Sequence, residues 1–194
     1  MMYPWLEESF RRVVERGQEL PHAVLLTGPK GIGKFVLAHE IARSLICAAT
    51  ENRPGCNKCQ GCHLFDVGNH PDYHLLTNEQ TVETGDPALA ASGERYLAQV
   101  GGRTSIGARP KRVIGVDQAR MLTEELRSTP HYAVGKVVVI YPADELNVNA
   151  ANALLKVLEE PTPNTHFLLV TGALYALPAT IRSRCSHYRL PLPT

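Results

Sequence analysis

At 194 residues, 44% of them hydrophobic, the chain is long enough for one α/β domain with a buried core and a small appendage. Its 20 basic and 19 acidic residues give a net charge of +1, which excludes bulk electrostatic attraction to nucleic acid. No apolar run approaches the about 20 residues of a membrane span, and the N-terminus lacks a signal-peptide pattern. We therefore expect a cytoplasmic protein, in which five cysteines indicate metal binding or free thiols rather than disulfides.

The first predicted elements are a helix, a strand and a second helix. Pro4 starts a segment whose apolar residues have helical spacing, and Gly17 ends it. The apolar run 23–26 predicts a buried strand, and residues 36–45 predict a helix. A glycine-rich stretch joins the strand to the second helix, which is the strand–loop–helix order of a phosphate-binding loop.

This loop has the sequence of a P-loop except at its last position. Gly28 and Gly33 with Lys34 match Gly-x-x-x-x-Gly-Lys, and Gly31 lies between them. The three glycines allow backbone N–H groups to turn inward around phosphate, and the lysine reaches the terminal phosphates. The next position should offer a hydroxyl to Mg²⁺, but Phe35 has none. We therefore expect a P-loop fold without its metal ligand, and a degenerate nucleotide site.

Four cysteines follow at the spacing C-x₈-C-x₂-C-x₂-C. They are Cys47, Cys56, Cys59 and Cys62. Two overlapping turns supply three thiolates for a tetrahedral ion, and the first cysteine can supply the fourth. The polar residues between them cannot build a core, so our interpretation is a structural Zn²⁺ site. An Fe–S cluster and unliganded thiols are the alternatives, and His63 is a competing ligand, whereas Cys185 is expected to be a free thiol.

Residues 78–112 differ in composition from the rest of the chain. They follow a short helical segment, 63–67, and a predicted strand, 73–76. The stretch is rich in glycine and arginine, and apart from a possible short element at 96–100 it has no regular apolar pattern. Such a long loop is either a tolerated surface insertion or functional, here as a basic flap that contacts DNA or a neighbouring subunit.

The second half predicts further strands and helices. The apolar runs 136–140 and 166–170 are typical of strands buried on both faces of a parallel sheet, and 187–190 is a candidate closing strand. Asp117 is the expected N-cap of one helix, and Asn147 or Asn149 that of another. Four or five strands alternating with helices favour a doubly wound parallel α/β sheet.

The strand 136–140 is not followed by the acids that a P-loop ATPase needs. Such an enzyme holds Mg²⁺ with a carboxylate after a neighbouring strand, usually beside a glutamate that positions water. Tyr141 and Pro142 occupy these positions, and Asp144 and Glu145 are expected to begin the next turn instead. Since the hydroxyl after the P-loop lysine is missing too, we expect no autonomous ATP hydrolysis.

Arg182 and Arg184 lie one residue apart after the last core strand. Surface arginines ordinarily pair with solvent or with carboxylates. In an oligomeric P-loop protein, an arginine at the subunit edge can instead enter a neighbour's site and stabilise transition-state charge. The residues alone leave both alternatives open.

Taken together, these patterns resemble the clamp-loader subunits of bacterial DNA polymerase III, within the AAA+ ATPases. The matching segments, in chain order, are 28–34, 47–62, 68–72, 115–117, 152–161 and 181–185. The resemblance implies an AAA+ P-loop fold, with a parallel five-stranded sheet flanked by helices and an inserted Cys₄ zinc module. It extends along almost the whole chain except 78–112, for which nothing is implied.

Two departures distinguish the chain from the motor subunits of this family, gamma and tau. Phe35 replaces the P-loop hydroxyl, and Tyr141-Pro142 replaces the acidic pair after the strand. The delta-prime subfamily keeps the fold and a Ser-Arg-Cys motif but does not hydrolyse ATP. The resemblance thus implies a subunit of the delta-prime type, in which Arg184 matches an arginine finger acting in trans and Thr171 matches a sensor position.

The resemblance also implies partners and further domains. The partners are gamma or tau motor subunits and a delta subunit in a hetero-pentamer, which brings in the sliding clamp and primer-template DNA. Residues 1–190 are expected to form the AAA+ domain, and 191–194 the start of a linker to lid and collar domains. The implied role is to position Arg184 against ATP in a motor subunit and to help load the clamp onto primed DNA during replication.

Two other functions remain open. A gamma-like or tau-like ATPase would need a substitute metal ligand, for example Asp144. A zinc-containing DNA-binding module would need a basic stripe, which is hard to reconcile with a net charge of +1.

Overall fold

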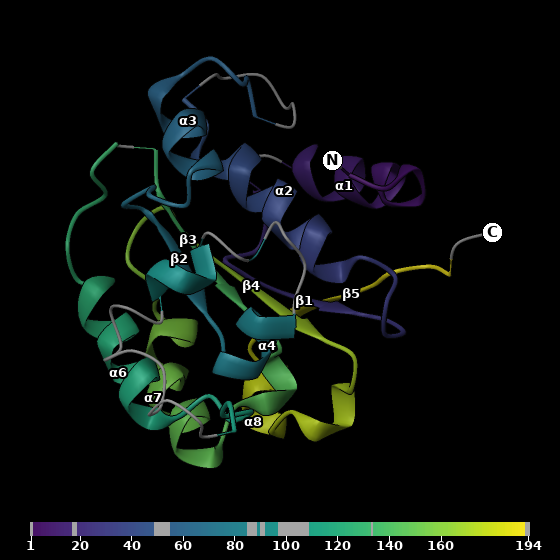
Figure 1. Ribbon diagram of the computed structural model, residues 1–194, viewed down its shortest axis with the longest axis vertical. Coiled ribbons are helices and arrows are strands. Elements are labelled where there is room, and N and C mark those ends of the chain that lie inside the picture. The colour runs from purple at the N-terminus through teal and green to yellow at the C-terminus, as the bar shows by residue number, and fades with distance from the viewer. Residues whose placement is uncertain are drawn as a thin grey trace.

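The fold is built on a sheet of five parallel strands, which the computed structural model places in the order β2-β3-β4-β1-β5 (Figure 1). The structure describes residues 2–16, 19–48, 55–84, 89, 92–96, 109–132 and 134–192. The strands are β1 Ala23–Thr27, β2 Tyr73–Leu76, β3 Lys136–Ile140, β4 Thr165–Thr171 and β5 Ser186–Arg189. The predicted parallel α/β sheet is therefore confirmed.

The middle of the sheet explains the unbroken apolar runs in the sequence. Every residue of β1 and β3 is buried, because helices cover both faces of these strands. β1 pairs with β4 on one side and with the exposed edge strand β5 on the other. Since all five strands run in one direction, their carboxyl ends meet at one edge, where ligands bind in open α/β sheets.

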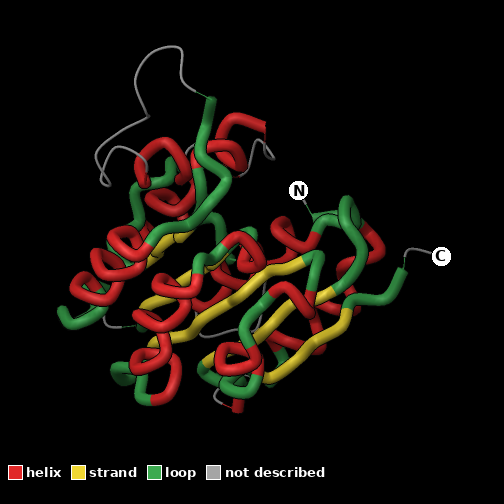
Figure 2. The backbone as a smooth tube through the Cα atoms, turned by 90° about the horizontal axis from the view of Figure 1, so that it is seen from below, coloured by secondary structure: helices red, strands yellow, loops and turns green. Residues whose placement is uncertain are grey.

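Helices flank the sheet (Figure 2). They are α1 Glu7–Val14, α2 Lys34–Ile46, α3 Gln60–Asp66, α4 Glu79–Thr84, α6 Val116–Glu125, α7 Val148–Glu159 and α8 Ala179–Arg182, with short 3₁₀ turns at Pro4–Leu6, Ala143–Glu145 and Leu174–Ala176. Tyr73 of β2 packs against Phe65 of α3, with ring centroids 4.7 Å apart. The next residue, His74, bonds Glu125 of α6 at 3.0 Å. Since adjacent strand residues point to opposite faces, α3 and α6 cover opposite faces of the sheet.

One of the two predicted helix starts is confirmed and the other is corrected. Asn147 caps α7, because its Oδ1 accepts a hydrogen bond from the N–H of Ala150 at 2.7 Å. The N-cap of α6 is Gly115 rather than Asp117. The Gln118 side chain accepts a hydrogen bond from the Gly115 N–H at 2.7 Å, while the aspartate lies in the first turn, where its charge favours the helix dipole.

The stretch 78–112 is more regular than its composition suggests. Its described residues include α4 and a helical segment at 92–96. Residues 85–88, 90–91 and 97–108 lie outside the described part, and so does most of the short element expected at 96–100.

Hydrogen bonds join the two ends of this stretch. The Asn78 side chain donates to the carbonyl of Arg112, and the Lys111 N–H donates to the Glu79 carboxylate at 2.9 Å. The chain therefore leaves and rejoins the domain at nearly one point. Because loop-closure cost grows slowly with length, an insertion held in this way can be long without disturbing the sheet.

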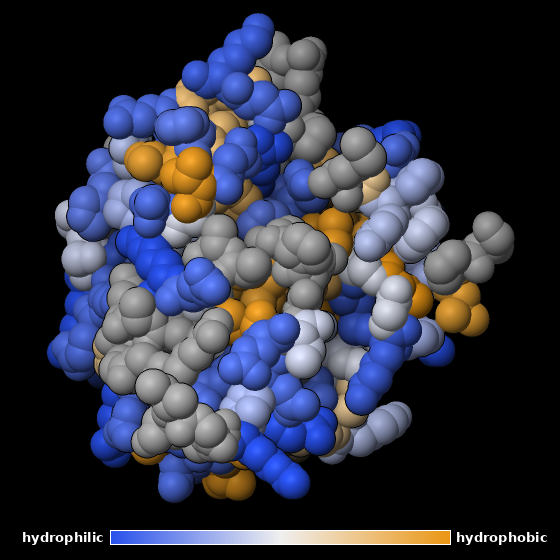
Figure 3. Space-filling view, viewed as in Figure 1, coloured by the Kyte–Doolittle hydropathy of each residue, from blue (hydrophilic) through white to orange (hydrophobic). Residues whose placement is uncertain are grey.

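The described surface is largely hydrophilic on the face shown in Figure 3, where hydrophobic side chains form small separate patches. None of the helices in the described part of the chain is long and apolar enough to cross a membrane.

Candidate functional site

The P-loop connects β1 to α2 at the carboxyl edge of the sheet. Gly28, Gly31 and Gly33 have φ angles of 151°, 81° and 85°, which side chains rarely adopt, and this explains the three glycines. Lys34 opens α2 and is buried, and its Nζ donates a hydrogen bond to the carbonyl of Pro29. The predicted loop is present, and its lysine folds back onto the loop itself.

A cleft of about 380 Å³ opens in front of the P-loop. Its lining includes the basic residues Lys30, Lys34 and Arg112 and the acidic residues Asp144 and Glu145. Arg112 pairs with Glu145 at 3.6 Å. A P-loop presents its backbone N–H groups to phosphate on this side, and both Lys34 and Arg112 are engaged by groups of the chain itself.

Asp144 begins a turn, as expected, and it also lines this cleft. It belongs to the 3₁₀ turn after β3 and accepts a hydrogen bond from the hydroxyl of Thr171, at the end of β4. Burial lowers the pKa of Lys34, and the charge of Asp144 partly opposes that effect. The expected turn is therefore confirmed, and it places Asp144 in the lining of the same cleft as the P-loop lysine.

Two aromatic rings occupy the region where the Mg²⁺ ligands of a P-loop ATPase are expected. Phe35, in the first turn of α2, is only 4% exposed. Its ring lies against that of Tyr141, which directly follows β3, with centroids 5.1 Å apart. Two residues that each lack a magnesium ligand thus form one apolar contact between the P-loop helix and the neighbouring strand. The sequence singled out both residues but not their contact.

The N-terminal segment packs against the outer side of the P-loop. Trp5 Nε1 donates a hydrogen bond to the carbonyl of Ile32 at 3.1 Å, and Tyr3 stacks on Trp5 with centroids 4.7 Å apart. A Cβ at Gly33 would lie 2.7 Å from the Tyr3 ring, so this glycine is required by close packing as well as by its φ. The predicted first helix begins here as a 3₁₀ turn that holds the loop.

Arg184 is held by contacts within the chain. Its Nη2 forms an ion pair with Glu159 at the end of α7, and its Nη1 donates to the carbonyl of Thr180 at 2.8 Å. Arg182, by contrast, lies over the ring of the exposed Tyr175, 5.5 Å from its centroid. The two arginines considered as candidate fingers therefore have different environments.

The four predicted metal ligands converge. The Sγ atoms of Cys47, Cys56, Cys59 and Cys62 all lie within 4.8 Å of one another. The Cys47–Cys59 and Cys56–Cys62 Sγ distances are 4.0 and 3.9 Å, near the about 3.8 Å edge of a tetrahedron with Zn–S bonds of about 2.3 Å. His63 is not part of this cluster of described residues. The donor set therefore fits a closed metal site.

Backbone N–H groups point at the sulfur atoms of this cluster. The N–H groups of Cys56, Cys59 and Cys62 donate to the sulfurs of Cys47, Cys56 and Cys59 respectively, each at 3.3 Å. Backbone hydrogen bonds lower the pKa of Cys56 to about 6, whereas burial raises the pKa of Cys62 to about 12. Since a metal binds the thiolate, hydrogen bonds donated to sulfur favour metal binding because they stabilise the deprotonated form.

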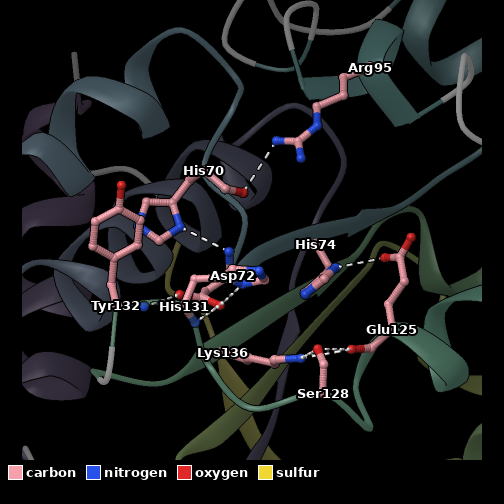
Figure 4. Close-up of polar contacts among 9 residues, drawn as sticks. All are labelled: His70, Asp72, His74, Arg95, Glu125, Ser128, His131, Tyr132 and Lys136. Atoms are coloured by element: carbon pink, nitrogen blue, oxygen red, sulfur yellow. Dashed lines mark hydrogen bonds and ion pairs between the residues drawn. The ribbon is translucent and has the colours of Figure 1, made fainter.

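A polar cluster lies around the start of β2, where the sequence singled out residues 68–72 but predicted none of their contacts (Figure 4). Asp72 is fully buried, and it accepts hydrogen bonds from the backbone N–H groups of His131 and Tyr132 at 2.8 and 3.0 Å. Arg95 donates to the carbonyl of His70 at 3.3 Å. These contacts fasten the turn before β2 to two distant segments.

The same cluster continues at the start of β3. Lys136 is 1% exposed, and its Nζ donates to Ser128 Oγ and to the Glu125 carbonyl, both at 2.7 Å (Figure 4). The Glu125 carboxylate pairs with His74 at 3.0 Å, and both residues line a cavity of about 330 Å³. The lysine is the one charged residue of the otherwise apolar strand β3, which is a sequence signal for this part of the cluster.

Comparison with known proteins identifies the family. The family described as "DNA polymerase III, delta subunit" matches residues 4–194. The chain belongs to this family. Proteins named DNA polymerase III subunit delta' from Pseudomonas aeruginosa and Escherichia coli are 36% and 34% identical to it over 192 and 194 residues. These alignments cover 99% and 98% of this chain but 49% of each relative, so the chain spans about half the length of these members of the delta-prime family.

A solved structure confirms the fold of this family member. The gamma subunit-related protein of DNA polymerase III from Thermotoga maritima aligns with 96% of this chain and 46% of its own, with a TM-score of 0.55. At 20% sequence identity this likeness concerns the fold. The AAA+ P-loop fold implied by the sequence resemblance is confirmed.

Proposed function

We propose that the chain is the AAA+ part of a non-hydrolysing delta-prime subunit of a cytoplasmic clamp loader. It would act with gamma or tau motor subunits and a delta subunit in a hetero-pentamer, which loads the sliding clamp onto primed DNA. Membership of the DNA polymerase III family supports this role. In this proposal residues 1–190 form the AAA+ unit, and 191–194 begin the link to lid and collar domains.

The observation that carries the non-hydrolysing role is the contact between Phe35 and Tyr141. A hydrolytic P-loop site needs a hydroxyl and a carboxylate there to hold Mg²⁺ against the phosphates. Both positions carry aromatic rings, and the rings pack on each other. Neither ring offers a carboxylate, and the apolar contact disfavours a hydrated cation between them.

A gamma-like ATPase is the second candidate, because Asp144 lines the cleft together with Lys34. However, one carboxylate oxygen of Asp144 already accepts a hydrogen bond from the Thr171 hydroxyl. Mg²⁺ requires near-ideal octahedral coordination by oxygen, and one partly engaged carboxylate is a poor replacement for the usual pair of ligands. The geometry therefore favours the non-hydrolysing role.

We further propose that Arg184 completes the ATP site of an adjacent motor subunit. Its side chain is 27% exposed, and the guanidinium has more N–H donors than its contacts within the chain use. An arginine that reaches a neighbour's phosphates raises the rate of phosphoryl transfer about 10³- to 10⁵-fold. This role makes the subunit essential to a reaction that it does not perform.

The cysteine cluster is proposed to hold a structural Zn²⁺ through Cys47, Cys56, Cys59 and Cys62. Four thiolates close a tetrahedral site, so no position remains for substrate or water. Such an ion would tie the end of α2 to α3, because the first ligand follows α2 and the last lies in α3.

The test uses the full-length subunit, alone and assembled with motor and delta subunits. Alone, we expect no Mg²⁺-dependent phosphate release above background. In the assembled loader, Arg184→Ala should lower DNA-stimulated ATP hydrolysis at the motor site that it completes about 10³-fold or more. Tight ATP binding and turnover by the isolated subunit, abolished by Lys34→Ala, would show that it is a motor subunit instead. Unchanged ATPase with Arg184→Ala would exclude the trans role.

A further inference from the structure

The position of the Arg184 side chain is set by a partner on another helix. Glu159, the last residue of α7, forms an ion pair with Nη2 of Arg184, which follows α8. On the other side, Nη1 donates to the Thr180 carbonyl at 2.8 Å. The guanidinium is thus held between the end of one helix and the turn that carries the arginine.

The two supports are themselves rigid. Leu158, next to Glu159, and Ile181, within α8, are both fully buried in the hydrophobic core. A free arginine loses rotamer entropy when it is fixed in one orientation. Because Arg184 is held by groups on two packed elements, this entropy is lost when the subunit folds, before any partner binds. The side chain is thus preorganised.

The stability of α7 does not account for a glutamate at this position. Glu159 ends the helix, where the partial negative charge of the helix dipole disfavours a carboxylate. The neighbouring Glu160 is also acidic, and Lys156 is the basic residue in the last turn. A carboxylate placed against the dipole is compensated by the arginine that it contacts.

The contact leaves the guanidinium able to serve a second partner. An arginine has five N–H donors, and the ion pair and the Thr180 carbonyl use two of them. The Nε–H is buried and has no partner in the described structure. The remaining Nη protons are available to an anion while the carboxylate still holds the other side.

We propose that Glu159 is a positioning residue that aligns Arg184 for the phosphates of the adjacent motor subunit. The proposal rests on the trans role of Arg184 stated above. Without the carboxylate, the arginine keeps its charge but loses one of its two fixed contacts. We expect this to affect the rate of hydrolysis rather than the binding of ATP, because a misaligned group acts mainly on the transition state.

The test measures DNA-stimulated ATP hydrolysis by the loader assembled from full-length subunits. Glu159→Ala and Glu159→Gln should lower kcat at the motor site that Arg184 completes about 10- to 100-fold, with the KM for ATP changed less than about twofold. Glu160→Gln is the matched control, because it removes one adjacent exposed charge that forms no described ion pair, and it should leave kcat unchanged. In the Arg184→Ala background, Glu159→Ala should have no further effect, since the group that it aligns is gone.

The outcomes separate this inference from the proposed function. If Arg184→Ala lowers hydrolysis but both Glu159 variants retain the normal kcat, the positioning role is wrong and the trans role stands. A higher kcat with Glu159→Ala would also overturn it, because the carboxylate would then compete with the neighbour's phosphates. Melting temperature and zinc content of each variant subunit, measured before assembly, identify any loss that comes from misfolding.

Discussion

Asp72 is a fully buried carboxylate, and its hydrogen bonds should make the stability of the protein depend on pH. Burial alone would raise its pKa, but the backbone N–H groups of His131 and Tyr132 and the side chain of His131 together outweigh that effect and hold the pKa below the ordinary value of 3.8. A carboxylate with a lowered folded-state pKa stabilises the protein above its unfolded-state pKa. That contribution is lost as the pH falls through the folded-state value.

We therefore expect Asp72→Asn to destabilise the protein by about 2 kcal/mol near neutral pH, because hydrogen bonds to a charged acceptor are lost. The difference from the unmodified protein should shrink as the pH is lowered below about 4. Urea unfolding of both proteins at a series of pH values measures this. Asp66→Asn is the control, because Asp66 pairs with Arg43 at a half-exposed site. A difference for Asp72→Asn that does not change with pH would show that its charge is not responsible.

At the scale of elements, we expect the order of the cysteine module to depend on the proposed metal ion as well as on core packing. The short helix α3 follows a polar turn and carries one ligand, Cys62, while Cys47 lies just after α2. The same segment packs Phe65 into the core, so loss of the ion is expected to loosen it without unfolding the sheet.

We expect Cys47→Ser to lower the bound zinc well below the about one ion per chain of a Cys₄ site. Cys185→Ser is the control, because this buried thiol is not part of the cluster and its loss should leave the zinc content unchanged. Metal analysis measures both. Hydrogen exchange after chelation should rise within 55–66 and stay low in β1 and β3. Full zinc occupancy in Cys47→Ser would mean that another residue completes the site.

The elements themselves were largely predictable, because burial on both faces leaves unbroken apolar runs in β1 and β3. The start of α6 was missed because Gln118, three residues into the helix, satisfies the backbone of Gly115 in place of a capping side chain there. The candidate site was predictable where its residues are close in sequence, as for the P-loop and the cysteines.

Contacts between distant segments were not predictable in the same way. Phe35 meets Tyr141, and Thr171 holds Asp144, only because the strand order brings the ends of β1, β3 and β4 to one edge. Local sequence patterns do not encode that order. The pairing of Arg184 with Glu159 is hidden for the same reason, since 25 residues separate the two.

At the scale of the whole molecule, the near balance of basic and acidic residues leads us to expect weak binding to DNA. A net charge of +1 gives little release of counterions on binding, so the 194-residue chain should bind primed DNA more weakly than about 10⁻⁴ M at physiological salt. Fluorescence anisotropy with labelled DNA over a range of salt concentrations measures this, and the assembled loader is the positive control. Micromolar binding with a steep salt dependence would favour the zinc-containing DNA-binding alternative.

The contact between Phe35 and Tyr141 also has an evolutionary consequence. Replacing one of the two rings alone by a polar metal ligand would remove this aromatic contact and place a polar group in an apolar environment, at a cost of about 2–4 kcal/mol. A domain is stable by only about 5–15 kcal/mol, so a lineage that takes this step loses stability before it regains a metal site. Both residues of the aromatic pair would therefore have to change together before a metal site could form. If the proposed non-hydrolysing role is correct, we expect descendants of this subunit to remain partners of a motor subunit.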